Sequence, residues 1–363
     1  MTLAATIADF LRHEIDVGTF PGCVYAVGSL QEIELEGALG NAVVVGARIP
    51  MRLETMFDAA SLTKPLITTT LALLAIADGA IALDQPVREI VRELEDTDKE
   101  GITFRHLLTH SGGFEAWFPL YAAGSDGASY LKSITSRALV YPPGRRVIYS
   151  DLGFILLHLA LQRVYGRELA DVAQRRIFAP LAIEDAGMNP TAEDVPGIAA
   201  TEWGQGVERG MCRDRGIAFD RFREQLMWGD VNDGNSWGLG GYAGNAGLFA
   251  TARAVFRIAS TYVAGGFPLL PAELIDEAVR NQTAGKEENR GLGWQIRSEA
   301  ASSISAPLSA DAFGHTGFTG TSVWLDPALE RIIVLMTNRI HPSAASVGMQ
   351  NARRELNRIV ASA

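Results

Sequence analysis

Strand-like and helix-like patterns occupy different parts of this chain, and this division limits most strongly the folds open to it. Runs typical of β-strands stand only near the two ends, at residues 23–29, 32–38, 293–297, 322–325 and 331–337. Residues 85–190 between them show mostly helical patterns interrupted by Gly and Pro. This order implies an α+β fold, with one sheet built from both termini and a mainly helical domain inserted. We predict a sheet domain of residues 1–60 and 287–363 and a helical domain of residues 61–286.

Amphipathic helices are predicted at both ends, where they would flank an antiparallel sheet. The first has an apolar stripe at helical spacing, made of Leu3, Ile7, Phe10, Leu11 and Ile15. The last is predicted near residues 346–359. The first segment has no basic stretch ahead of its apolar residues, and it places Asp9, Arg12 and Glu14 where a signal peptide keeps an uncharged core. We therefore expect a cytoplasmic protein.

The charge balance argues against a nucleic-acid partner. The chain has 32 Lys and Arg against 42 Asp and Glu, a net charge of −10, and a pI near 5.2, whereas a phosphate backbone requires a basic face. Its two cysteines, Cys23 and Cys212, offer no zinc cluster. The longest apolar run, residues 66–77, is too short for a membrane span and contains three threonines. We expect a small-molecule substrate and no membrane span, and the sequence leaves the oligomeric state open.

Residues 191–247 have poor periodicity and contain Trp203, Trp228, Trp237 and many glycines. A stretch of this length without regular structure is typical of a binding or lid region. We predict a long loop region that walls the site. The three tryptophans would serve as walls or as packing, and the sequence does not separate these two roles.

Common cofactor motifs are missing from the chain. There is no G-x-x-x-x-G-K and no H-E-x-x-H, and the glycine-rich run at residues 238–247 lacks the G-x-G-x-x-G spacing. His106 and His110 stand four residues apart and could share a metal, but no carboxylate or cysteine at ligand spacing completes such a site. We expect them to form buried hydrogen bonds where a helix ends, with no metal and no cofactor.

The segment Ser61-Leu-Thr-Lys64 places a hydroxyl and an amine three residues apart at the start of an apolar helix predicted to be buried, over residues 61–78. A desolvated lysine with a lowered pKa can accept the proton of a serine nucleophile. The chain contains a second S-x-x-K, Ser129-Tyr-Leu-Lys132, in a more polar stretch that is typical of a solvated helix face.

Two further segments could complete a site with Ser61. Tyr149 precedes Ser150 and Asp151, and a tyrosine can shuttle protons where a nearby ammonium favours its phenolate. His315-Thr-Gly317 is followed by Phe318, and small residues there would let a strand pass a substrate and offer main-chain N–H groups to an acyl oxygen. Each segment alone could also be ordinary structure, a core tyrosine or a glycine-rich turn.

Five segments together resemble the serine β-lactamase and penicillin-binding protein superfamily, and most closely its class C β-lactamase, family VIII carboxylesterase and D-aminopeptidase branch. In chain order they are Phe57-Asp-Ala-Ala-Ser-Leu-Thr-Lys64, Ile102-Thr-Phe-Arg-His-Leu-Leu-Thr-His-Ser-Gly-Gly113, Tyr149-Ser-Asp151, Ala243-Gly-Asn-Ala-Gly-Leu-Phe249 and His315-Thr-Gly-Phe-Thr-Gly320. The resemblance covers residues 20–340 and implies a β-lactamase/transpeptidase-like fold.

The resemblance implies a role for each matching residue. Ser61 would be the acylated nucleophile, Lys64 its proton partner, and Tyr149 the group that relays the proton to the leaving group and activates water. The main-chain N–H groups of Ser61 and Phe318 would form the oxyanion hole. Substrate would contact the remaining motif positions, namely Asp151, His315, Thr316 and Gly317.

Two departures from the family pattern bear on the substrate. His315 stands where the family often has a lysine that pairs with a carboxylate, and histidine is mostly neutral at pH 7. Asp151 stands where asparagine is common, which replaces an amide donor by an acceptor. Both changes indicate weaker binding of anionic substrates, so we expect a serine hydrolase of small esters or amides with at most weak β-lactam hydrolysis. The alternatives are a D-Ala-type peptidase or carboxypeptidase, a true β-lactamase, and an inactive penicillin-binding-like sensor or binding module.

Overall fold

A seven-stranded antiparallel sheet joins the two ends of the chain. The computed structural model describes residues 2–263, 269–300 and 303–363. The strand order is β3-β2-β1-β10-β9-β8-β7, so the first and last long strands are neighbours at its centre. The strands are β1 (Gly22–Gly28), β2 (Ile33–Val43), β3 (Ile49–Pro50), β7 (Gln295–Ile296), β8 (Phe313–Thr316), β9 (Ser322–Asp326) and β10 (Arg331–Thr337). The α+β class and the antiparallel sheet built from both ends are confirmed.

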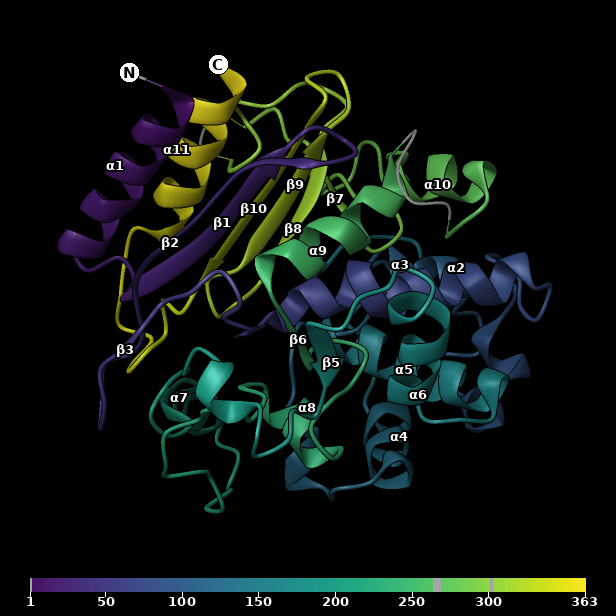
Figure 1. The fold of residues 1–363 in the computed structure, drawn as a ribbon. Helices are drawn as coiled ribbons and strands as arrows, with labels where there is room; N and C mark the ends of the chain where they lie inside the picture. The colour runs from purple at the N-terminus through teal and green to yellow at the C-terminus, as the bar shows by residue number, and fades with distance from the viewer. Residues whose placement is uncertain (1, 264–268, 301–302) are drawn as a thin grey trace.

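Side chains along β1 point alternately to the two faces of the sheet, and both faces are covered. Tyr25 and Val27 face a core formed with α1 (Leu3–Asp16) and α11 (Met349–Ala361), the two terminal helices that lie side by side in Figure 1. Val24 and Ala26 face the opposite core, which α9 (Ala252–Ala259) shares with the helical part. The flanking terminal helices are thus confirmed.

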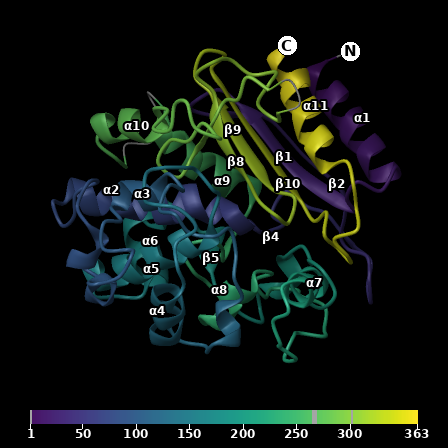
Figure 2. The same ribbon diagram turned by 180° about the vertical axis from the view of Figure 1, so that it is seen from behind.

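The remaining helices gather beside one face of the sheet, and Figure 2 shows them from behind. They are α2 (Thr70–Ala77), α3 (Phe104–Leu108), α4 (Gly127–Ser136), α5 (Asp151–Tyr165), α6 (Leu169–Ala173), α7 (Gly206–Asp214), α8 (Gly234–Gly238) and α10 (Ala272–Val279). One continuous apolar core runs from the sheet into this part. This shared core does not test the domain boundaries predicted above, and they stay a prediction.

The helix expected over residues 61–78 is built from three pieces. A 3-10 turn (Ala60–Leu62) leads into a π-helical turn (Lys64–Thr69) and then α2. The stretch Ala60–Ala77 is long and apolar enough to span a membrane, with a mean hydropathy of 1.4, but 83% of it is buried inside the protein, as in a core helix. No other described helix passes that test.

Residues 191–247 are less irregular than predicted, because they include α7 and α8. The short α8 is capped by Asp233, whose side chain accepts a hydrogen bond from the N–H of Ser236. A small second sheet of β4 (Phe57–Asp58), β6 (Leu248–Ala250) and β5 (Ala186–Met188) was not predicted. Its strand β4 leads directly to Ser61.

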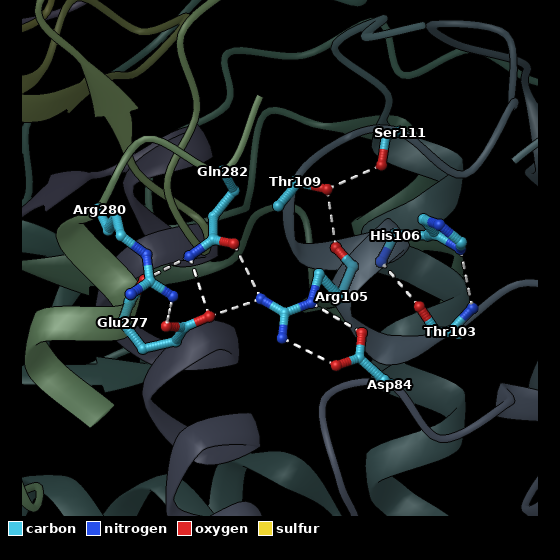
Figure 3. Close-up of polar contacts among 9 residues, drawn as sticks. All are labelled: Asp84, Thr103, Arg105, His106, Thr109, Ser111, Glu277, Arg280 and Gln282. Carbon is cyan, nitrogen blue, oxygen red and sulfur yellow. Dashed lines mark hydrogen bonds and ion pairs between the residues drawn. The ribbon is translucent and has the colours of Figure 1, made fainter. Parts of the chain in front are cut away.

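An ion-pair network holds α10 against α3. Arg105 donates hydrogen bonds to Asp84, Glu277 and Gln282 at 2.8, 2.6 and 2.8 Å, as Figure 3 shows. The same guanidinium thus joins the start of α3 to the segment of Asp84 and to the end of α10.

Candidate active site

Ser61 lies at a strained point of the backbone. The preceding residue, Ala60, has φ +49°, a left-handed conformation that costs a non-glycine residue about 1–3 kcal/mol. Asp58 holds this conformation, because one of its carboxylate oxygens accepts from the N–H of Ala60 at 2.8 Å and the other from the N–H of Asn232 at 2.7 Å. The side chain of Asp58 is buried, and burial raises its pKa to about 6.

Lys64 is fully buried and contacts three groups. Its Nζ donates to Ser61 Oγ at 2.9 Å and to the main-chain oxygen of Asn245 at 3.0 Å. It also forms an ion pair with Asp151 Oδ1 at 2.7 Å. The ammonium therefore joins the predicted nucleophile to a carboxylate at the start of α5.

The expected lowering of the Lys64 pKa was wrong. Burial alone lowers it, but Asp151 and Tyr149 together outweigh burial and raise the pKa above its ordinary value. Burial also raises the pKa of Asp151, while Lys64 acts in the opposite direction. Because the sequence expectation considered only desolvation, it omitted the carboxylate partner. Lys64 is an ammonium in this arrangement.

Tyr149 lies between Lys64 and two histidines. Lys64 Nζ is 4.9 Å from the centre of the Tyr149 ring. The ring of His110 lies 4.5 Å from that of Tyr149, and the ring of His315 lies 5.8 Å from it. His110 Nδ1 accepts from the N–H of Ser150 at 3.0 Å, which fixes the residue next to Tyr149. His110 is a positioning residue whose role the sequence reasoning missed.

The buried hydrogen bond expected where a helix ends is confirmed for His110, whereas His106 is half-buried and bonds at the start of α3. His106 Nδ1 accepts from the N–H of Thr103 at 3.2 Å, in a reciprocal cap of α3 that Figure 3 displays. Burial lowers the pKa of both histidines, that of His110 well below its ordinary value. In the described part of the chain, no three His, Cys, Asp or Glu residues are grouped to hold a metal ion.

The end of β8 packs against the segment that precedes Ser61. A Cβ added at Gly317 would lie 2.6 Å from the main-chain oxygen of Ala59, so only glycine permits this approach. Thr319 and Thr321 donate to the main-chain oxygens of Asp58 and Ala59, at 2.7 and 2.9 Å. These bonds join the loop carrying Phe318 to the strand leading to Ser61.

Phe318 presents a free main-chain donor beside Ser61. Among the residues the structure describes, its N–H has no protein acceptor, while its carbonyl accepts from Arg339 at 2.9 Å. Ser61 and Phe318 both line the same two cavities. The predicted oxyanion donors are thus brought together at one opening.

Two cavities meet at Ser61, Tyr149 and Phe318. We call the first, of about 300 Å³, the acidic cavity; besides Asp151 it is lined by Glu202, Glu208, Asp233, Trp117 and Met211. We call the second, of about 340 Å³, the arginine cavity; it is lined by His315, Thr316, Gly317, Arg290, Arg339 and Arg353. The predicted catalytic and substrate-binding residues all line one or both, except Lys64, which lies beneath Ser61.

The comparison with protein families agrees with this geometry. The model of the family described as Beta-lactamase matches residues 7–357. The chain belongs to the β-lactamase family. It is a serine hydrolase of that family, and its fold is the β-lactamase/transpeptidase-like fold that we predicted.

The relatives of this β-lactamase-family chain are named for different activities. An Escherichia coli (strain K12) protein named "Putative D-alanyl-D-alanine carboxypeptidase" is 28% identical over 93% of this chain and 82% of its own length. The beta-lactamase/D-alanine carboxypeptidase structure from Pseudomonas syringae has a TM-score of 0.77 and 18% identity, covering 99% and 98% of the two chains. EstCE1, a hydrolase with promiscuous acyltransferase activity, has a TM-score of 0.75 and 19% identity, covering 99% and 98%. Family membership therefore leaves the substrate open.

The arginine cavity contains charged groups that the expectation of weak anion binding did not consider. His315 itself is neutral, because burial and the nearby Arg290 lower its pKa well below the ordinary value. Positive charge comes instead from Arg339 and Arg353, while Arg290 forms an ion pair with Glu288, which lines the same cavity. Arg353 is buried and its pKa is lowered to about 9, chiefly by burial. In the described structure neither Arg353 Nε nor His315 Nε2 has a hydrogen-bond partner.

Other candidates from the sequence lie outside the two cavities. Ser129 hydrogen-bonds Asp126 near the start of α4, and Lys132 is exposed on the same helix, as predicted for a solvated face. Trp228 donates to the main-chain oxygen of Ile198, and Trp203 and Trp237 are exposed. The tryptophan beside the site is Trp117, which follows the segment 102–113 and which the sequence reasoning did not single out.

Proposed function

We propose that this chain forms an acyl-enzyme on Ser61 and hydrolyses small esters or amides that carry a negatively charged group. The observation that carries the proposal is the buried Lys64 ammonium, 2.9 Å from Ser61 Oγ and beside Tyr149, at the opening of two cavities. A serine beside an ordered cation and a proton relay is the arrangement that acyl transfer requires.

In the proposed first step, Ser61 Oγ attacks the acyl carbon and its proton passes to Tyr149. The Lys64 ammonium keeps Oγ in place by its hydrogen bond and stabilises the negative charge that develops nearby. The main-chain N–H groups of Ser61 and Phe318 donate to the acyl oxygen. Tyr149 then protonates the leaving alcohol or amine as its bond to the acyl carbon breaks, and a water activated by Tyr149 releases the acid from Ser61.

The charge of the arginine cavity supports an anionic group on the substrate. Arg290 and Arg353 are both buried, and one nitrogen of Arg353 is unpartnered in the described structure. A carboxylate in this cavity would be attracted by the positive charge of Arg339 and Arg353. The opposite cavity, with Glu202, Asp233 and the apolar Trp117, suits an uncharged or positively charged end.

A second candidate is a peptidase acting on D-alanyl peptides, whose free carboxylate would suit the same cavity. The name of the Escherichia coli relative supports the peptidase. A panel that contains p-nitrophenyl acetate, an ester with a carboxylate on its leaving group, D-alanyl-D-alanine and a chromogenic cephalosporin separates the candidates. The anionic ester should be the best substrate; fastest turnover of the dipeptide would favour the peptidase.

The nucleophile is tested by labelling with a fluorophosphonate, which phosphonylates activated serines. We expect the intact protein to gain one adduct by mass, and Ser61→Ala to gain none. Ser129→Ala is the matched control, because it removes the serine of the other S-x-x-K segment, and it should label like the wild type. Unchanged labelling or ester hydrolysis in Ser61→Ala would refute the proposed mechanism.

A further inference from the structure

The carboxylate of Asp151 is set against the ammonium that serves Ser61. Asp151 is the first residue of α5, and its side chain is 18% exposed toward the acidic cavity. Lys64 has no exposed side-chain surface, and its ion pair with Asp151 is 2.7 Å long. A charged contact this short and this sheltered from water is weakly screened.

Other ionisable groups around Lys64 do not replace this charge. Neutral histidines face it from the end of α3 and from β8, and the cation Arg290 lies over the Tyr149 ring, 5.2 Å from its centre. Asp233, at the start of α8, is near enough to influence Asp151 but forms no ion pair with Lys64 in the described structure. The groups that face the ammonium are therefore Tyr149, Asp151, His110, His315, Arg290 and Asp233.

We propose that Asp151 is a positioning residue that sets the upper pH limit of activity, by holding Lys64 as an ammonium to higher pH than a neutral residue would. This inference rests on the proposed acyl-enzyme function. A carboxylate 2.7 Å from an ammonium makes the ammonium hold its proton more tightly. The form of Lys64 that serves Ser61 then survives to higher pH.

The test is the dependence of kcat/KM on pH, from pH 5 to 10, with an uncharged ester. Asp151→Asn should move the alkaline limb of the profile to lower pH by about one unit or more. Asp151→Glu keeps the charge and should restore most of the wild-type position. Asp311→Asn removes an exposed carboxylate between β7 and β8 and is the matched control, expected to leave the profile in place.

The outcomes separate this inference from the proposed function. Fluorophosphonate labelling of the wild type is measured first, and its absence would count against the acyl-enzyme itself. If the wild type labels but Asp151→Asn has a lower rate with an unmoved alkaline limb, Asp151 is only structural and the inference is overturned. Should Asp151→Asn fail to fold, Asp151→Ser removes the same charge at the same helix start, and the same shift is expected.

Discussion

The guanidinium of Arg353, on the last helix, donates to the main-chain oxygen of Gly317 at 2.7 Å and to that of Thr321 at 2.8 Å. These two carbonyls bracket the loop that carries Phe318. The C-terminal helix thereby determines where one predicted oxyanion donor lies relative to Ser61. A residue remote from the nucleophile in sequence shares in placing the acyl oxygen.

Replacing Arg353 by methionine should lower both stability and rate. The change leaves two buried carbonyls without their charged donor, which costs about 2–4 kcal/mol of unfolding free energy. A displaced Phe318 N–H should lower kcat by about 10–100-fold. Thermal unfolding and ester hydrolysis measure the two effects. Arg358→Met removes an exposed arginine of the same helix and should change neither; a fully active Arg353→Met would contradict this account of the loop.

Arg290 should distinguish substrates by charge. It lines the arginine cavity, so Arg290→Gln should raise KM about tenfold or more for an ester with a carboxylate and leave KM for its uncharged analogue nearly unchanged. The measurement is kcat and KM for the matched pair of esters. An equal rise in KM for both esters would show that Arg290 supports the site but does not distinguish substrates by charge.

Gly317 should not tolerate even alanine. Its added Cβ would lie 2.1 Å from Thr321 Oγ1 and 2.6 Å from the main-chain oxygen of Ala59. Since the second atom is backbone, the strand must move away from Ser61, and we expect Gly317→Ala to lose about 1–3 kcal/mol of stability and most activity. Gly187→Ala in β5 meets no atom within 4 Å and provides the control. An unchanged crystal structure and normal activity of Gly317→Ala would contradict the close approach of Gly317 to the main chain of Ala59.

Glu208 should make stability fall as pH rises. Its carboxyl is buried and accepts from the N–H of Gly234 at 2.8 Å, and burial raises its pKa to about 8 from an ordinary 4.5. Between these two values the unfolded chain binds fewer protons than the folded one, so the free energy of unfolding decreases with increasing pH. Glu208→Gln stays neutral and lacks this contribution.

The measurement for Glu208 is the difference in Tm between Glu208→Gln and the wild type. This difference should become more favourable to the variant from pH 5 to pH 8, whatever the cost of the altered hydrogen bonds at pH 5. A difference that is independent of pH would show that Glu208 is ionised in the folded protein throughout this range.

Local pattern predicted the long elements well, because their apolar periodicity reflects the face that they bury. The stripe of α1 and the strands β1 and β10 are examples. The short elements were missed for the opposite reason. The strands β4, β5 and β6 have two or three residues each and exist only because they pair with each other, and α8 is five residues long and starts from an aspartate cap. No periodicity can appear in so few residues.

The residues of the candidate site were likewise predicted only in part. Ser61, Lys64 and Tyr149 come from motifs whose order is readable in the chain, and the structure brings them together. The arginine cavity could not be predicted, because Arg290 and Arg353 belong to different segments and reach His315 only through the fold. The raised pKa of Lys64 was missed because Asp151 was considered only as a contact for substrate.

The central pairing of β1 with β10 also governs when this protein can begin to work during its synthesis. Ser61 leaves the ribosome long before β8, which packs against the turn around Ser61, and before Arg353, which anchors the Phe318 loop. A nascent chain that has already made its serine and lysine therefore has no finished site. The acyl chemistry begins only after Arg353 has been translated, so products truncated before it would be inert rather than uncontrolled hydrolases.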